Sequence, residues 1–134
     1  MKAKSLFFKL FIIAALCIPA FAFAEIKNED AAKIDELIKS GKYTLIDVRT
    51  KEEYNAAHIQ GAINIDYYND DFAKIIEAKL KDKNKAYIIY CRSGRRSLYA
   101  AEILEKLGFT NITNMKGGIL DWQSAGKPLV KQAQ

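Results

Sequence analysis

A single cysteine stands among three arginines in the stretch YCRSGRRSLYAAEIL, which covers residues 90–104. The cysteine is Cys91, and the arginines are Arg92, Arg95 and Arg96. Cysteine reacts as the thiolate, and nearby positive charge favours the thiolate over the thiol. The residue types and their spacing therefore predict a cysteine nucleophile in a site that holds an anion.

The residues on either side of Cys91 predict a loop between a buried strand and a helix. The run AYIIY, residues 86–90, is continuously apolar, and apolar residues recur at helical spacing from a helix start near Ser97 to Leu107. In parallel sheets, ligands bind at the carboxyl ends of strands, where backbone amides and helix N-termini attract anions. Gly94 can adopt the positive φ that a ring of inward-facing amides needs. We expect Cys91 to be catalytic and the anion to be bound by Arg92, Ser93, Gly94, Arg95 and Arg96.

The length of this loop limits which anion it suits. Cysteine-dependent phosphatases need one more residue between the cysteine and an arginine, because their loop surrounds a tetrahedral phosphate. Here Arg96 follows Cys91 after four residues, and Ser97 stands where a phosphatase would have its arginine. The smaller ring suits a cysteine that carries one extra sulfur atom, whose anionic end would lie among the amides. A phosphatase or an arsenate reductase is the alternative within the same chemistry.

The first 24 residues differ in composition from the rest of the 134-residue chain. Three lysines lead into the apolar run LFIIAALCI, and the small-residue pattern Ala22-Phe23-Ala24 follows. This is typical of a secretory signal peptide cleaved after about Ala24, while Pro19 and the short apolar run argue against a membrane-spanning helix. We expect a periplasmic protein with no stable membrane insertion and one domain over residues 25–134.

Removal of such a leader changes both the charge and the cysteine count. The chain has 21 basic and 16 acidic residues, and the leader holds three of the lysines and no acid, so 18 basic residues remain. This small excess of positive charge does not suggest a nucleic-acid binder. Cys17 leaves with the leader, so Cys91 cannot form an internal disulfide and needs either burial or a use. One histidine and one cysteine cannot supply a zinc site, and we expect no metal and no cofactor.

Strands and helices alternate along the rest of the chain. Apolar spacing and turn residues predict helices over residues 28–40, 50–57, about 70–80, 97–107 and 119–125, and strands over residues 44–48, 63–65, 86–90 and 111–115. Thr50 and Glu53 have the spacing of a capping box at the start of the second helix. The alternation implies right-handed crossovers and an α/β fold, with a mostly parallel sheet covered by helices on both faces.

Several motifs occur in a fixed order along the chain. They are Asp47-Val48-Arg49, Glu53-Tyr54, His58-Ile59, Gly61-Ala62, Asn64-Ile65, the loop from Cys91 to Ser97, and Gly117-Gly118 with Trp122. On these motifs the sequence resembles the single-domain rhodanese-like sulfurtransferases of the exported bacterial type. The resemblance implies a central, mostly parallel sheet of about five strands. Ala57 and Gln60 stand where that family usually has glycine and proline. This difference concerns the shape of the turn around His58 and Ile59, and not the loop at Cys91.

The resemblance also implies an activity by double displacement. Thiosulfate would give its outer sulfur to Cys91, sulfite would leave, and a thiophilic acceptor would collect the sulfur. Cyanide and thiols, including a protein thiol, are such acceptors. An alternative from another functional class is a non-catalytic module that carries sulfane sulfur or binds a partner protein.

Three polar residues outside the loop have structural interpretations as well as functional ones. His58 is the only histidine, and the resemblance implies that it makes structural hydrogen bonds in its turn. Asp47 and Arg49 flank a tight turn, where an ion pair or a set of caps is expected. Arg49 is also a candidate for contact with substrate.

Overall fold

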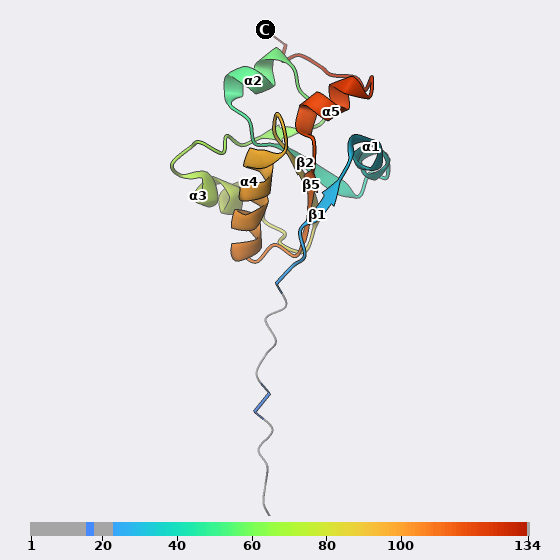
Figure 1. Ribbon diagram of the computed structural model, residues 1–134. Coiled ribbons are helices and arrows are strands. Elements are labelled where there is room, and N and C mark those ends of the chain that lie inside the picture. Colours follow the sequence, from blue (N-terminus) through green and yellow to red (C-terminus); the bar gives the residue numbers. More distant parts are fainter. Residues whose placement is uncertain (1–15, 18–22, 134) are drawn as a thin grey trace, which may run out of the picture.

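The structure is a computed structural model that describes residues 16–17 and 23–133 (Figure 1). The leader predicted over residues 1–24 lies almost entirely outside the described residues. Within the described part, no helix combines the length and the apolar character needed to span a membrane.

Within residues 23–133, five parallel strands form one sheet in the order β1-β5-β4-β2-β3. The strands are β1 (Lys27–Glu29), β2 (Tyr43–Asp47), β3 (Ile63–Asn64), β4 (Ala86–Tyr90) and β5 (Asn111–Met115). The central strand β4 has the sequence AYIIY and is apolar throughout because both of its faces are covered. The predicted α/β fold with a mostly parallel sheet of about five strands is confirmed.

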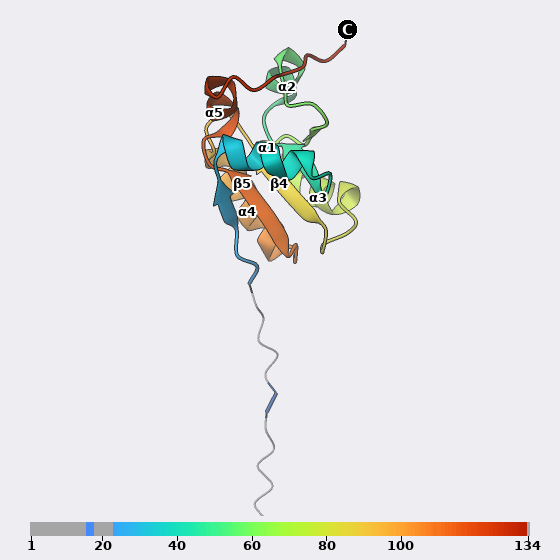
Figure 2. The ribbon, with the colours of Figure 1, turned by 90° about the vertical axis from the view of Figure 1, so that its right-hand side faces the viewer.

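Helices cover both faces of the sheet, as Figures 1 and 2 show. They are α1 (Ala31–Lys39), α2 (Lys51–Ala56), α3 (Phe72–Lys79), α4 (Arg95–Lys106) and α5 (Gly118–Ser124). Phe72 of α3 and Leu104 of α4 belong to the core on one face, and Ile34 of α1 and Trp122 of α5 belong to the core on the other. The carboxyl ends of the strands, where Cys91 lies, are therefore held between two packed layers.

The first helix begins later than the sequence predicts. Residues 28–29 belong to β1, which pairs with β5 at the edge of the sheet, and Asp30 then caps α1 by accepting a hydrogen bond from the Lys33 amide at 2.8 Å. The prediction of a helix from residue 28 was wrong because the pairing partner of β1 lies far away in the sequence. A three-residue strand without an apolar pattern carries no local signal.

The fourth helix begins at Arg95, two residues earlier than the sequence predicts. Gly94 precedes it with φ +96°, and no side chain caps the helix. The amides of a helix's first turn have no partner within the helix. In this helix, that donor-rich end faces Cys91, which explains why the usual capping residue is not needed.

The capping box at the second helix is confirmed. The Glu53 amide donates to the Thr50 hydroxyl at 3.3 Å, and the Thr50 amide donates to the Glu53 carboxylate at 3.0 Å. Together these bonds satisfy backbone donors at the start of α2. The capping box fixes where the chain turns away from β2, close to the loop at Cys91.

Candidate active site

Cys91 follows directly after β4 and is 1% exposed. Its Sγ accepts a hydrogen bond from the Gly94 amide at 3.1 Å and another from the Ser97 hydroxyl at 3.4 Å. Both donors come from the loop and the first turn of α4. The sulfur is thus buried on one side by the core and faces hydrogen-bond donors on the other.

The surroundings of Cys91 have opposite effects on its ionisation. Burial raises the pKa of the thiol, whereas hydrogen bonds from the Ser97 hydroxyl and from the amides of Ser97, Gly94 and Ser93 lower it. The hydrogen bonds outweigh the burial, and the pKa lies below its usual value. The site therefore favours a thiolate, the nucleophilic form of cysteine.

The carbonyls of the loop are held on the side opposite to its amides. The first turn of α5 donates to them: the Ile119 amide to the Cys91 carbonyl at 2.9 Å, and the Leu120 amide to the Arg92 carbonyl at 3.2 Å. Because a trans peptide directs its N–H away from its C=O, the amide of Ser93 then faces the sulfur. A Cβ atom on Gly118 would overlap both carbonyls, so a glycine there lets α5 approach the loop.

Gly94 also occupies a position that no other residue fits. Its φ is +96°, which confirms the positive φ predicted from the sequence. A Cβ atom there would overlap the carbonyl oxygen of Lys116, because the loop packs directly against the end of β5.

The three arginines have different surroundings. Arg92 and Arg95 are exposed, whereas Arg96 donates to both carboxylate oxygens of Glu53 at 2.8 and 2.9 Å and stacks over the ring of Tyr68. We expected the arginines to lower the pKa of Cys91, but the main causes are the Ser97 hydroxyl and the loop amides. The reason is geometric, because Arg96, the arginine whose charge interacts with Cys91, is already paired with the Glu53 carboxylate.

Arg49 is buried and forms an ion pair with Asp47. Its NH2 group donates to the Asp47 carboxylate at 2.7 Å and to the Ala57 carbonyl at 2.7 Å. The ion pair predicted from the sequence is present. Arg49 also lines a hollow of about 250 Å³ that reaches Arg92 of the loop, and its contact with substrate stays a prediction.

His58 has the structural surroundings that its turn motif implies. Its ring stacks on Tyr54 with the ring centres 3.7 Å apart, and its Nδ1 lies 2.8 Å from the Tyr54 carbonyl oxygen. Its backbone pairs with Val130 near the C-terminus. His58 therefore ties the turn after α2 to the C-terminal segment.

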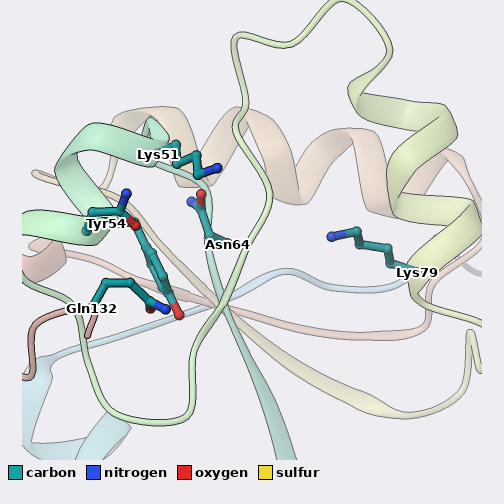
Figure 3. A pocket seen from close by; sticks show the side chains of 6 residues that line it. Lys51, Tyr54, Asn64, Lys79 and Gln132 are labelled. Atoms are coloured by element: carbon teal, nitrogen blue, oxygen red, sulfur yellow. The ribbon is translucent and has the colours of Figure 1, made fainter. Parts of the chain in front are cut away.

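A larger hollow, of about 630 Å³, lies elsewhere (Figure 3). Lys51 and Lys79 extend toward it from α2 and α3, with Asn64 of β3 between them. Its remaining lining residues are Tyr54, Asn55 and Gln132. None of these six residues is a cysteine. We therefore place the candidate active site at Cys91 and not at this larger hollow.

Two side chains at the site were not predicted as functional residues. Ser97 donates to the sulfur of Cys91, and Asn114 donates to the Gly94 carbonyl at 3.4 Å. A signal for Ser97 was present, since a hydroxyl at the start of a helix after a cysteine lies within reach of the thiolate. Asn114 comes from another strand, and its contact depends on the register between β4 and β5.

Comparison with known proteins identifies the family. The family model described as a rhodanese-like domain matches residues 30–125. The chain belongs to the rhodanese-like domain family. The family named by its sequence motifs is thereby confirmed.

Relatives of this rhodanese-like domain include sulfurtransferases. Thiosulfate sulfurtransferase PspE of Escherichia coli is 42% identical over 76 residues, which cover 57% of this chain and 70% of PspE. A rhodanese of Escherichia coli solved with anions superposes with a TM-score of 0.57 at 38% identity and covers 67% of this chain and 99% of its own. The rhodanese-like domain of an Anabaena protein superposes with a TM-score of 0.71 at 24% identity, covering 81% of both chains, and shows the same fold.

Proposed function

We propose that the protein is a thiosulfate sulfurtransferase in which Cys91 carries the transferred sulfur as a persulfide. The observation that carries this proposal is the set of hydrogen bonds that reach the sulfur from the Ser97 hydroxyl and from the amides of Ser93, Gly94 and Ser97. These donors favour a negatively charged sulfur, which both the thiolate and the persulfide provide.

The reaction divides into two displacements at sulfur. The Cys91 thiolate attacks the outer sulfur of thiosulfate, a new S–S bond forms, and sulfite leaves with the electron pair of the broken S–S bond. Cyanide or a thiolate acceptor then attacks the outer sulfur of the persulfide, and Cys91 leaves as the thiolate. The first displacement leaves a negative charge on the outer sulfur of the persulfide, and the second leaves it on the Cys91 sulfur; the loop amides are already oriented to stabilise an anion there.

The loop length supports sulfur chemistry over phosphate chemistry. Arg96 follows Cys91 after four residues and points to Glu53 rather than across the loop. A phosphatase needs an arginine over a tetrahedral anion. In this chain that loop position is occupied by Ser97, whose hydroxyl donates to the cysteine sulfur instead.

The proposed location is the periplasm, on the basis of the leader pattern in residues 1–24. Fractionation of cells that produce the full chain tests this part separately. Recovery of a shortened protein in the periplasmic fraction is expected, and a full-length protein in the cytoplasm would contradict it.

The activity is tested by thiocyanate formation from thiosulfate and cyanide. We expect turnover by the native protein and none by Cys91→Ser. Equal turnover in Cys91→Ser would rule out the proposed mechanism. A Cys91 that takes up sulfur without turnover would instead indicate a carrier, and hydrolysis of an aryl phosphate would favour a phosphatase.

A further inference from the structure

Asn114 lies in β5 beside the end of β4, where its register partner is Ile89. The residue is 2% exposed. Its side-chain amide donates to Asn28 of β1 at 3.0 Å and to the Gly94 carbonyl at 3.4 Å. Its Oδ1 has no hydrogen-bond partner in the part of the chain that the structure describes.

A polar side chain at this position is unexpected for packing alone. Ile112, two residues earlier on β5 and on the same face of the strand, belongs to the apolar core. A buried amide with an unpaired oxygen costs free energy that an apolar residue would avoid. Such local conflicts in an otherwise consistent fold tend to occur at functional sites.

The bond to Gly94 determines the orientation of one peptide of the loop. The Gly94 carbonyl accepts from Asn114 and from the Leu98 amide, so the peptide between Gly94 and Arg95 is held from its oxygen side. Because this peptide is trans and planar, the Arg95 N–H points the opposite way, out of the N-terminal end of α4. That end of the helix is where Ser97 and Gly94 contact the sulfur of Cys91.

The same peptide would turn easily without a second tether. Gly94 lacks a side chain and can adopt a wide range of backbone angles, which is also why it can take φ +96°. Rotation of the peptide would direct a carbonyl oxygen, instead of an amide, toward an anionic sulfur. The hydrogen bond from Asn114, which lies in β5, opposes this rotation.

We propose that Asn114 is a positioning residue, whose amide holds the Gly94–Arg95 peptide so that the Arg95 N–H faces the outer sulfur of a persulfide on Cys91. This inference rests on the persulfide in the proposed function. It does not depend on thiosulfate being the donor.

The test compares persulfides that are loaded without thiosulfate. Native protein, Asn114→Leu, Asn114→Thr and the control Thr113→Val are treated with inorganic polysulfide, and the rate of persulfide alkylation by iodoacetamide is followed against pH by mass spectrometry. Thr113 is a suitable control because it is buried on β5 and its hydroxyl also has no partner among the described residues. Thermal unfolding of each variant shows whether it is folded.

Both Asn114 variants are expected to shift the alkylation profile to higher pH and to slow loading by thiosulfate about tenfold, the effect of losing one hydrogen bond to an anion. Thr113→Val should change neither. If folded Asn114 variants keep the native profile, Asn114 has only a structural role and the inference is overturned. If the profile shifts but the native protein does not use thiosulfate, the inference stands and the proposed donor fails. If Cys91 takes up sulfur from neither polysulfide nor thiosulfate, both are overturned.

Discussion

Cys91 combines two properties that usually exclude each other, since it is almost fully buried and yet its pKa lies below the usual value of a cysteine. Burial in apolar surroundings normally keeps a cysteine protonated and inert. Here the core covers one side of the residue, and the loop presents donors to its sulfur. The lowered pKa of Cys91 thus depends on individual hydrogen bonds more than on net positive charge.

Ser97→Ala tests this dependence on single donors. Removal of the hydroxyl is expected to raise the pKa of Cys91, because that hydroxyl is the foremost of the groups that lower it. Alkylation of Cys91 near neutral pH should slow about tenfold, the effect of one lost hydrogen bond to a charged group. The measurement is the alkylation rate against pH, and an unchanged profile would show that the backbone amides suffice.

The exposed arginines are expected to act at longer range. In Arg92→Ala/Arg95→Ala, the KM for thiosulfate should rise and its dependence on salt should weaken, because exposed cations attract an anionic substrate through solvent. The pKa of Cys91 should stay close to that of the native protein. A large rise in that pKa, with KM unchanged, would contradict the assignment of the anion to the amides.

At this scale the sequence predicts the nucleophile and the loop, but not the residues that reach the loop from elsewhere. Cys91 and Gly94 were predictable because their chemistry and backbone needs are local. Asn114 was not, since only strand pairing brings β5 beside the loop. Glu53 was predicted as a cap and is also the partner of Arg96, 43 residues away in the sequence.

Among the elements, α2 and α4 are joined through one carboxylate. Glu53 closes the capping box of α2 and pairs with Arg96 in the first turn of α4. The Arg96 guanidinium is the main cause that lowers the pKa of Glu53 to about 2, against the opposing effect of partial burial. The pair thereby fixes α2 against the start of α4, the helix that follows the loop at Cys91.

Glu53→Gln tests this connection through pH. A carboxylate whose pKa is lower in the folded state stabilises the protein above its unfolded-state pKa, and this stabilisation is lost as pH falls through the folded-state pKa. The native protein should therefore exceed the variant in free energy of unfolding by roughly 1 kcal/mol near neutral pH, because solvent screens a partly exposed pair. The difference should vanish as pH falls toward about 2. A difference independent of pH would contradict the ion-pair explanation.

Gly118 and Gly126 form a matched pair for testing the approach of α5 to the loop. Both have positive φ, but a Cβ at Gly118 would overlap the Cys91 and Arg92 carbonyls, whereas a Cβ at Gly126 meets nothing within 4 Å. Each change to alanine should cost about 1 kcal/mol or more in strain. Only Gly118→Ala should also slow alkylation of Cys91, and equal rates in the two variants would show that α5 does not orient the loop.

The elements also show where local patterns stop being informative. The bounds of β4 agree with the prediction because its apolar run is continuous, and those of β5 agree because Gly108 and Gly117 mark turns on either side of it. Strand β1 has three residues without an apolar pattern and exists through its pairing with β5. Asn28 of β1 accepts a hydrogen bond from Asn114. A strand that the local sequence does not reveal therefore contacts a residue next to the loop at Cys91.

Over the whole molecule, the parallel sheet brings the candidate site to one edge. Asp47 pairs in register with Tyr90, the residue before Cys91, and Asn114 pairs with Ile89, so the carboxyl ends of β2, β4 and β5 lie side by side. Alternation of strands and helices predicts such an edge, because ligands bind where parallel strands end. The strand order, which places β5 between β1 and β4, is set by long-range packing and is not readable from the local pattern.

The most direct test is the mass of the Cys91 peptide after native protein is treated with thiosulfate. We predict a gain of one sulfur atom on Cys91, release of one equivalent of sulfite, and loss of that sulfur to cyanide as thiocyanate. The Cys91→Ser variant should gain nothing. An unmodified Cys91 in folded protein, or the same gain in Cys91→Ser, would contradict the persulfide mechanism.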